Sequence, residues 1–372
     1  MKTLPSWAQW GAYFALRGIA AIPQIAGVQS SLRAVAAVGK AHATSRINQK
    51  RLARAESHLE LAYPEWTTDQ RRQCAISAFQ HAFMLAVEAA FSPRLITPYT
   101  WHRHVEYLDA GPVLRVMLER RPVMLLTGHC GNWEILGAAL CMLGYPISAL
   151  YRPLDLQPLD NWVRRSRARS GMRLIDKFGA LRSLPGILER GEPTAFVADQ
   201  NGGDRGIFVP FFGRLVSSYK SISLMAIRYQ AVIVVGQARR LGWRGGDTAP
   251  DLSPAEIERQ RLAEGFRFRV EVGDIFGPED YMNQPDPAYY LTARYRLAIE
   301  KMIRSSPWDY FWMHRTWRSR PVHERLNKPF PDSLRRRLES LPWLNDADVA
   351  ALIDRSDRDR RILAHHGVTR LP

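Results

Sequence analysis

Four short apolar runs constrain the possible fold of this chain most, and most of them are bounded by glycine or proline. They cover residues 123–127, 147–150, 194–198 and 232–235. Runs of this length predict buried β-strands. Residues 266–272 alternate between apolar and charged side chains, which predicts a strand exposed on one face. Helical stretches separate or follow these strands near residues 132–142, 159–171, 181–190, 218–230 and 287–304. This order predicts an α/β fold with a mixed central sheet flanked by helices.

The first 43 residues predict a helical segment that associates with a membrane. Trp7, Trp10 and Phe14 recur at helical spacing, and an aromatic helix with basic residues suits the membrane interface. Charged and polar residues interrupt a membrane span, and Pro23 is expected to kink or end the helix. The alternative is a helix that packs on the main domain. Thr67 or Thr68 is expected to cap the next long helix, which runs to about residue 90.

We expect three parts in the chain. They are the N-terminal membrane-associating segment (1–43), a catalytic domain (44–326) and a basic, helical C-terminal extension (327–372). The cysteines Cys74, Cys130 and Cys141 have no metal-ligand spacing, and an odd number argues against a secreted disulfide framework. Because no signal peptide pattern and no apolar run of about 18 residues are found, the catalytic domain is expected on the cytoplasmic side.

The formal net charge of +16 narrows the class of partner. Such an excess of positive charge favours anionic partners: nucleic acid, an anionic membrane surface or an acidic carrier protein. Charge alone does not choose between them. No zinc-finger, helix-turn-helix or RNA-recognition motif is found, so a nucleic-acid-binding protein is the weaker interpretation. A serine hydrolase is disfavoured because no Gly-x-Ser-x-Gly motif is present.

The segment from Thr127 to Glu134 carries the strongest chemical signal. It follows a predicted buried strand and opens a helix, a common place for active-site groups in α/β sheets. With His129 in the loop and Glu134 in the first helical turn, the carboxylate can reach back to the imidazole. Such a pair can remove a proton from a hydroxyl group. The alternative is a loop histidine beside a glutamate that favours the helix start.

Further motifs resemble one enzyme family. The string Gly128-His129-Cys130-Gly131-Asn132-Trp133-Glu134 resembles the His-x4-Asp/Glu motif of the glycerolipid acyltransferase superfamily, in its lipid A biosynthesis (lauroyl/myristoyl) branch. Other motifs follow in that family's order: Tyr151-Arg152-Pro153, Arg169-Ser170-Gly171, Asp199-Gln200, Val209-Pro210-Phe211-Phe212-Gly213 and Tyr310-Phe311-Trp312-Met313-His314-Arg315-Thr316-Trp317. The resemblance extends from about residue 45 to residue 321.

The resemblance implies an acyltransferase at the cytoplasmic face of the inner membrane. Its donor would be an acylated acyl carrier protein or acyl-coenzyme A, and its acceptor a hydroxyl of a membrane glycolipid, with no metal or bound cofactor. His129 and Glu134 would be catalytic. The implied substrate-binding residues are Asn132, Arg152, Arg169, Asp199 and Arg315. The same superfamily also contains enzymes for other acceptors, such as phospholipids, mannosides or aminolipids. The family's N-terminal membrane span is weak here, and the 327–372 tail exceeds its pattern.

Some residues allow two interpretations. Asp199 could orient Arg152 or His129, could form a turn, and is the second candidate for the carboxylate that supports His129. The Phe211-Phe212-Gly213 segment could line an acyl groove or belong to the core. We expect His314 to support the active-site side, with Arg315 as a phosphate contact. Cys130 is a poor nucleophile candidate, because adjacent residues in an extended loop point apart.

Overall fold

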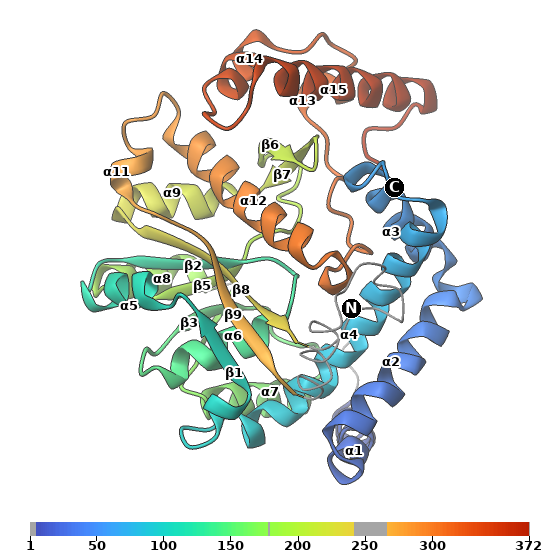
Figure 1. The fold of residues 1–372 in the computed structure, drawn as a ribbon, viewed down its shortest axis with the longest axis vertical. Helices are drawn as coiled ribbons and strands as arrows, with labels where there is room; N and C mark the ends of the chain where they lie inside the picture. Colours follow the sequence, from blue (N-terminus) through green and yellow to red (C-terminus); the bar gives the residue numbers. More distant parts are fainter. Residues whose placement is uncertain (1–4, 178, 242–265, 372) are drawn as a thin grey trace, which may run out of the picture.

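The structure, a computed structural model, describes residues 5–177, 179–241 and 266–371 (Figure 1). The helices are α1 (Ser6–Ala26), α2 (Val28–Thr44), α3 (Gln49–Ala62), α4 (Thr68–Leu95), α5 (Gly111–Leu118), α6 (Trp133–Met142), α7 (Gln157–Ala168), α8 (Ala180–Glu189), α9 (Lys220–Tyr229), α11 (Pro278–Tyr281), α12 (Pro287–Ser305), α13 (Val322–Arg325), α14 (Asp332–Glu339) and α15 (Asp346–His366). Short 3-10 helices are η1 (Arg46–Asn48), η2 (Trp101–Arg103) and η3 (Pro307–Asp309). The strands are β1 (Val105–Leu108), β2 (Val123–Thr127), β3 (Ser148–Tyr151), β4 (Arg173–Asp176), β5 (Thr194–Val197), β6 (Ile207–Phe211), β7 (Arg214–Ser218), β8 (Val232–Arg240) and β9 (Phe268–Phe276).

The central sheet has seven strands in the order β1-β9-β8-β2-β5-β3-β4. All neighbours are parallel except β8 and β9, which pair antiparallel. The predicted mixed sheet flanked by helices is therefore confirmed. Strands β6 and β7 form a separate antiparallel hairpin.

Alternating residues of β2 face two separate hydrophobic cores. Val123 and Leu125 lie in the core beneath α5 and α6, whereas Met124 and Leu126 lie in the core shared with α8, α9 and α12. This period of two follows from the pleat of a strand. Because helices cover both faces, the strand has no polar side, and it appears in the sequence as a continuous apolar run.

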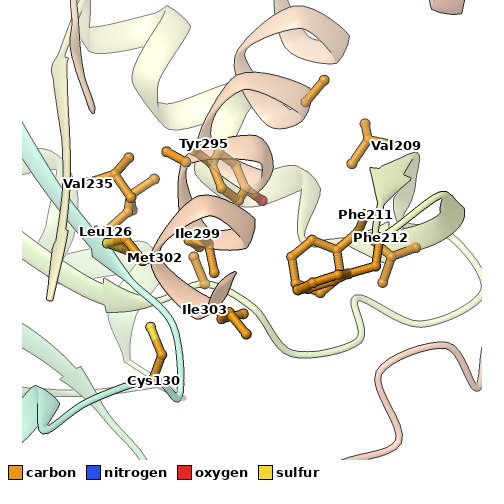
Figure 2. Packing of buried hydrophobic residues seen from close by; sticks show 14 of the residues in the cluster. Leu126, Cys130, Val209, Phe211, Phe212, Val235, Tyr295, Ile299, Met302 and Ile303 are labelled. Atoms are coloured by element: carbon orange, nitrogen blue, oxygen red, sulfur yellow. The ribbon is translucent and has the colours of Figure 1, made fainter. Parts of the chain in front are cut away.

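Helix α12 packs against the carboxyl end of the sheet. Figure 2 shows its Ile299, Met302 and Ile303 in the same buried cluster as Leu126 of β2 and Cys130 just beyond that strand. The helix therefore lies directly behind the loop that follows β2. It also contacts the β6–β7 hairpin, so it links the sheet to that smaller unit.

The N-terminal segment forms two helices. Helix α1 continues past Pro23 to Ala26, so of the two expected effects of this proline, a kink or an end, the helix end is not found. Several of its large apolar side chains are exposed, including Trp7, Phe14 and Ile25. Thr67 caps α4 as expected, in a reciprocal capping box with Gln70. Among the described helices, only α4 has the length and hydropathy for a membrane span, but 56% of its apolar window is buried inside the protein.

The C-terminal extension is helical. It contains α14 and α15, and α15 packs on α13 and on β7 of the hairpin. Figure 1 places α14 and α15 at the opposite end of the molecule from α1.

Candidate active site

The loop between β2 and α6 is held by hydrogen bonds from three directions. Gly131 N–H donates to the Asp309 carbonyl at 2.9 Å, and Asn132 N–H donates to the Ala238 carbonyl at 2.7 Å. Phe311 N–H donates to the His129 carbonyl at 3.1 Å. Gly131 has a φ of +57°, and a Cβ at this position would lie 2.4 Å from the Ala238 carbonyl oxygen. The loop therefore requires glycine at residue 131.

The carboxylate that contacts His129 is Asp199. The two side chains are 2.7 Å apart, Nδ1 to Oδ1, and the other carboxylate oxygen accepts the His129 backbone N–H at 2.9 Å. Asp199 is only 1% exposed, and the His129 side chain is 13% exposed. Burial acts to raise the pKa of Asp199, but His129 and then Arg296 hold this pKa well below its ordinary value. Asp199 is therefore ionised and can only accept, which puts a proton on Nδ1 and makes Nε2 the acceptor of the ring. The Gln200 side-chain amide nitrogen lies 3.4 Å from Nε2.

The sheet topology explains why residues 70 positions apart meet. Strands β2 and β5 are adjacent and parallel, with Thr127 in register with Val197. His129 and Asp199 each lie two residues beyond this pair, at the same edge of the sheet. Asp199 is thus the partner of His129 in the structure, as the second candidate considered for that role. Its expected contact with a substrate is not what the geometry shows, because both of its carboxylate oxygens bind His129.

The expected contact between Glu134 and His129 is wrong in this structure. Glu134 lies in the first turn of α6 and forms a two-pronged ion pair with Arg167 of α7, with Arg167 Nε 2.8 Å from Oε2. The carboxylate turns to Arg167 because a planar guanidinium matches both of its oxygens. Arg167 was not predicted, because it lies among several arginines that read as a solvated helix face.

Asn132 was expected to contact the substrate, but its side chain has a structural role. It is fully buried, and it caps α6 by accepting the backbone N–H groups of Glu134 at 3.1 Å and Ile135 at 3.0 Å. Its amide nitrogen donates to buried Glu88 at 2.7 Å. Glu88 is held in turn by Arg240, also buried, whose Nη2 is 2.7 Å away. No part of the Asn132 side chain remains open to a substrate.

Aromatic rings surround the imidazole of His129. The ring centroid of Trp133 is 4.9 Å from that of His129, and those of His314 and Phe311 are 4.7 and 5.7 Å away. Burial, then the charge of His129, lowers the pKa of His314 to about 4. His314 is therefore neutral at physiological pH and supports the His129 side of the loop as a packing partner.

Two further alternatives are decided by burial. Cys130 is buried, and this burial raises the pKa of its thiol far above the ordinary value. The thiolate needed for nucleophilic attack is therefore not available. Phe211 and Phe212 are also buried, and they belong to the core around α12 and not to an acyl groove.

An apolar pocket of about 250 Å³ lies between the sheet and helices α5 and α6. Its lining includes Thr127 and Trp133, which flank the His129 loop in the sequence. The charged side chains in its lining are Glu134, Arg152, Arg167 and Glu271. Most of the other lining residues are aliphatic, and a few are aromatic; the aliphatic ones include Val113, Leu125, Leu136, Leu140, Ile147, Met172, Val234 and Val270. The site thus combines a His–Asp pair with an adjacent apolar cavity that carries charged groups.

The remaining predicted arginines lie in different places. Arg152 is exposed and lines the apolar pocket, as expected for a residue just beyond β3. Arg169 is exposed at the end of α7 and lines a smaller neighbouring pocket that shares Glu134 and Arg167. Arg315 is exposed beside His314, near the positive charge of Arg54. Arg152 therefore shares a pocket with Thr127 and Trp133, and the roles of Arg152, Arg169 and Arg315 stay predictions.

Comparisons with known proteins identify the family of this chain. Residues 1–246 match the model of the bacterial lipid A biosynthesis acyltransferase family. The chain is 27% identical over 285 residues to the lipid A biosynthesis palmitoleoyltransferase of Escherichia coli (strain K12), covering 74% of this chain and 81% of that protein. It is 25% identical over 282 residues to the lipid A biosynthesis lauroyltransferase of the same organism, covering 74% and 82%. Because the family model matches well over half of its residues, the chain belongs to the bacterial lipid A biosynthesis acyltransferase family, and it is an acyltransferase.

Proposed function

We propose that this enzyme transfers a fatty acyl chain from an acyl thioester to a hydroxyl group of a lipid A precursor, with His129 and Asp199 as the general-base pair. The observation that carries the proposal is the His129–Asp199 pair beside an apolar pocket. A base supplies the proton chemistry that a hydroxyl acceptor needs, and the pocket suits a hydrocarbon chain. The names of the relatives supply the acceptor class.

The proposed reaction needs no acyl-enzyme. Nε2 of His129 takes the proton of the acceptor hydroxyl as its oxygen attacks the thioester carbonyl. Asp199 stabilises the imidazolium that forms, through its bond to Nδ1. When the tetrahedral intermediate collapses, the carbon–sulfur bond breaks and the imidazolium returns the proton to the departing sulfur. An ester and a free thiol result.

The pocket is proposed to hold the acyl chain of the donor. Its aliphatic walls remove the chain from water, which is favourable in proportion to the apolar area buried. Arg152, the Glu134–Arg167 pair and Glu271 supply the charged groups of its lining. Forked guanidinium groups suit the phosphate of a carrier's prosthetic arm or of the acceptor lipid. Glu134 is therefore proposed to help position the substrate, and not to belong to the general-base pair.

The membrane is proposed to supply the acceptor through the side of the molecule that carries α1. Arg17 of α1 stacks over the Trp162 ring of α7, 4.6 Å from its centroid, and α7 also carries Arg167. The exposed aromatic side chains of α1 therefore lie on a helix attached to a wall of the site. The net charge of +16 suits the anionic cytoplasmic face of the inner membrane and an acidic carrier protein.

A reconstituted transfer assay tests the proposal. Purified enzyme is incubated with either acyl carrier protein or coenzyme A bearing a labelled acyl chain, and with a lipid A precursor, phosphatidylglycerol or no acceptor. We expect labelled lipid A precursor by mass spectrometry, and its loss with His129→Ala. Transfer to phosphatidylglycerol alone would reject the acceptor, and an unaltered rate with folded His129→Ala would reject the base.

A further inference from the structure

Arg296, on helix α12, contacts the main chain at Asp199, the residue that pairs with His129. It is fully buried, at 0% exposure. Its Nη1 donates to the Asp199 backbone carbonyl at 2.7 Å, and its Nη2 donates to the Gln200 carbonyl at 3.0 Å. Its Nε donates to the Ser218 hydroxyl at 2.8 Å, and Nη2 also reaches the Ser217 carbonyl at 3.4 Å. One side chain therefore joins the turn after β5 to the end of β7.

The same helix also supports the other half of the catalytic pair. A Cβ on Gly128 would lie 2.9 Å from Cγ2 of Ile299, so α12 packs directly against the backbone that precedes His129. Ile299 lies three residues after Arg296, on the same face of the helix. One rigid element thus contacts both chain segments whose spacing sets the 2.7 Å bond between His129 and Asp199.

We infer that Arg296 is a positioning residue for Asp199: it fixes the Asp199–Gln200 turn so that both carboxylate oxygens meet His129. This rests on the proposed function, because it deepens the role of the same pair. Arg296 acts through the main chain and does not touch the substrate. Its charge also favours the ionised form of Asp199, because an opposite charge close to a carboxylate stabilises the anion.

The contacts require arginine in particular. A guanidinium presents five N–H donors in one rigid plane and no acceptor, which matches four oxygens spread over two chain segments. A lysine would keep the positive charge, but its single nitrogen cannot reach the Asp199 carbonyl and the Ser218 hydroxyl together. Arg296→Lys therefore keeps the positive charge and removes the forked hydrogen bonds, so it tests the two contributions separately.

The test compares Arg296→Lys with Arg214→Lys. Arg214 is a matched control because it is also a nearly buried arginine with a forked contact, to Asp359 of α15, and it has no contact with the Asp199 turn. We expect Arg296→Lys to lower kcat by about 10²-fold, as for an ångström-scale misplacement of a catalytic group, with KM little changed. Arg214→Lys should lower the melting temperature and leave the kcat of the folded protein unchanged.

A second readout does not depend on turnover. The Nδ1–H proton of His129 in its bond to Asp199 gives a low-field proton NMR resonance, assigned by its loss in His129→Ala. We expect Arg296→Lys to shift or broaden it and Arg214→Lys to preserve it. Failure of the proposed function would instead appear as a wild-type protein with the resonance but no transfer activity.

The inference is overturned if folded Arg296→Lys keeps the wild-type kcat and resonance, or if Arg214→Lys alters both equally. Should Arg296→Lys not fold, Ser218→Ala removes only the acceptor of Nε. It should lower kcat at constant KM, and an unchanged kcat and resonance would overturn the inference.

Discussion

The two carboxylates near the catalytic loop have different partners, which leads to opposite kinetic expectations. Asp199→Asn removes the charge that stabilises the imidazolium, so kcat should fall by about 10²–10⁴-fold with KM nearly unchanged. Glu134→Gln breaks the pair with Arg167 in the pocket lining, so its main effect should be a higher KM. Steady-state kinetics on both variants, with circular dichroism to confirm folding, checks this. A near-normal Asp199→Asn beside an inactive Glu134→Gln would return the partner role to Glu134.

Cys130 is adjacent to His129 in the sequence, but its buried, protonated thiol should take no part in transfer. Cys130→Ala is expected to retain most of the wild-type kcat, because direct transfer forms no thioester on the enzyme. Intact-mass spectrometry after incubation with acyl donor alone should show no acyl adduct on the wild type. An adduct that disappears in Cys130→Ala would replace direct transfer by a covalent route.

At the level of elements, apolar runs could be read from the sequence and polar edge strands could not. The bounds of β2, β3 and β5 match the predicted apolar runs within one residue. The start of β8 also matches, but this strand continues to Arg240, five residues beyond the predicted run. Strand β4, Arg173–Asp176, was missed because it lies at the sheet edge and is half polar. Strand β6 contains Pro210, which is tolerated because the hairpin is a two-stranded unit.

The catalytic pair shows the same limit. His129 was identified from its position after a strand, but a five-residue spacing favoured Glu134 as its partner. The pairing with Asp199 depends on β2 and β5 being neighbours in the sheet. The local sequence does not determine the order of strands in a sheet. A useful signal was present nonetheless, because His129 and Asp199 lie two positions and one position after predicted buried strands. Arg167 and Arg296 carried no such signal, because their partners become close only in the folded chain.

Helix α1 leads to a prediction about membrane binding. Trp7 and Phe14 are 79% and 64% exposed, which is unusual for large apolar side chains and suits the membrane interface. Changing both to serine should weaken co-sedimentation with anionic vesicles. Ile362→Ser, on the distant helix α15 and 45% exposed, is the control and should bind like wild type. Equal binding by all three proteins would exclude α1 as the attachment site.

Over the whole molecule, buried histidines should make stability depend on pH. Burial lowers the pKa of His58, His314 and His323 to about 4, from an ordinary value of 6.5. Between pH 6.5 and 4 the unfolded chain therefore binds protons that the folded chain does not, so stability falls as the pH falls. Asp309 and Glu324 act in the opposite direction, because burial raises the pKa of Asp309 to about 6 and that of Glu324 above its ordinary value. Buried His81 adds to the effect of the three histidines, because burial lowers its pKa as well.

The expected result is a lower melting temperature at pH 5 than at pH 7.5. His323→Gln removes one titrating group whose Nε2 lies 2.9 Å from the Ser356 hydroxyl, and it should reduce the difference between the two pH values. A melting temperature that is equal at both pH values would contradict the assignment of these histidines as neutral in the folded state.

The C-terminal extension is joined to the rest of the protein by Asp359 of α15, which is fully buried between two arginines. Its Oδ2 lies 2.7 Å from Arg214 Nε and 2.9 Å from Arg320 Nη2. Asp359→Asn would leave the nearly buried Arg214 guanidinium without its carboxylate partner, whereas Arg320 keeps its buried pair with Glu324. Breaking a buried pair in this way costs about 3–5 kcal/mol, whereas an exposed pair contributes less than about 1 kcal/mol.

Asp354→Asn is the matched control, since its pair with Arg358 on the same helix is exposed at both ends. Denaturant unfolding should show a large loss of stability for Asp359→Asn only, while the kcat of each folded variant stays at the wild-type level. Equal, small losses would mean that α15 is not fastened to the hairpin by this carboxylate, and a loss of kcat in folded Asp359→Asn would connect the extension to catalysis.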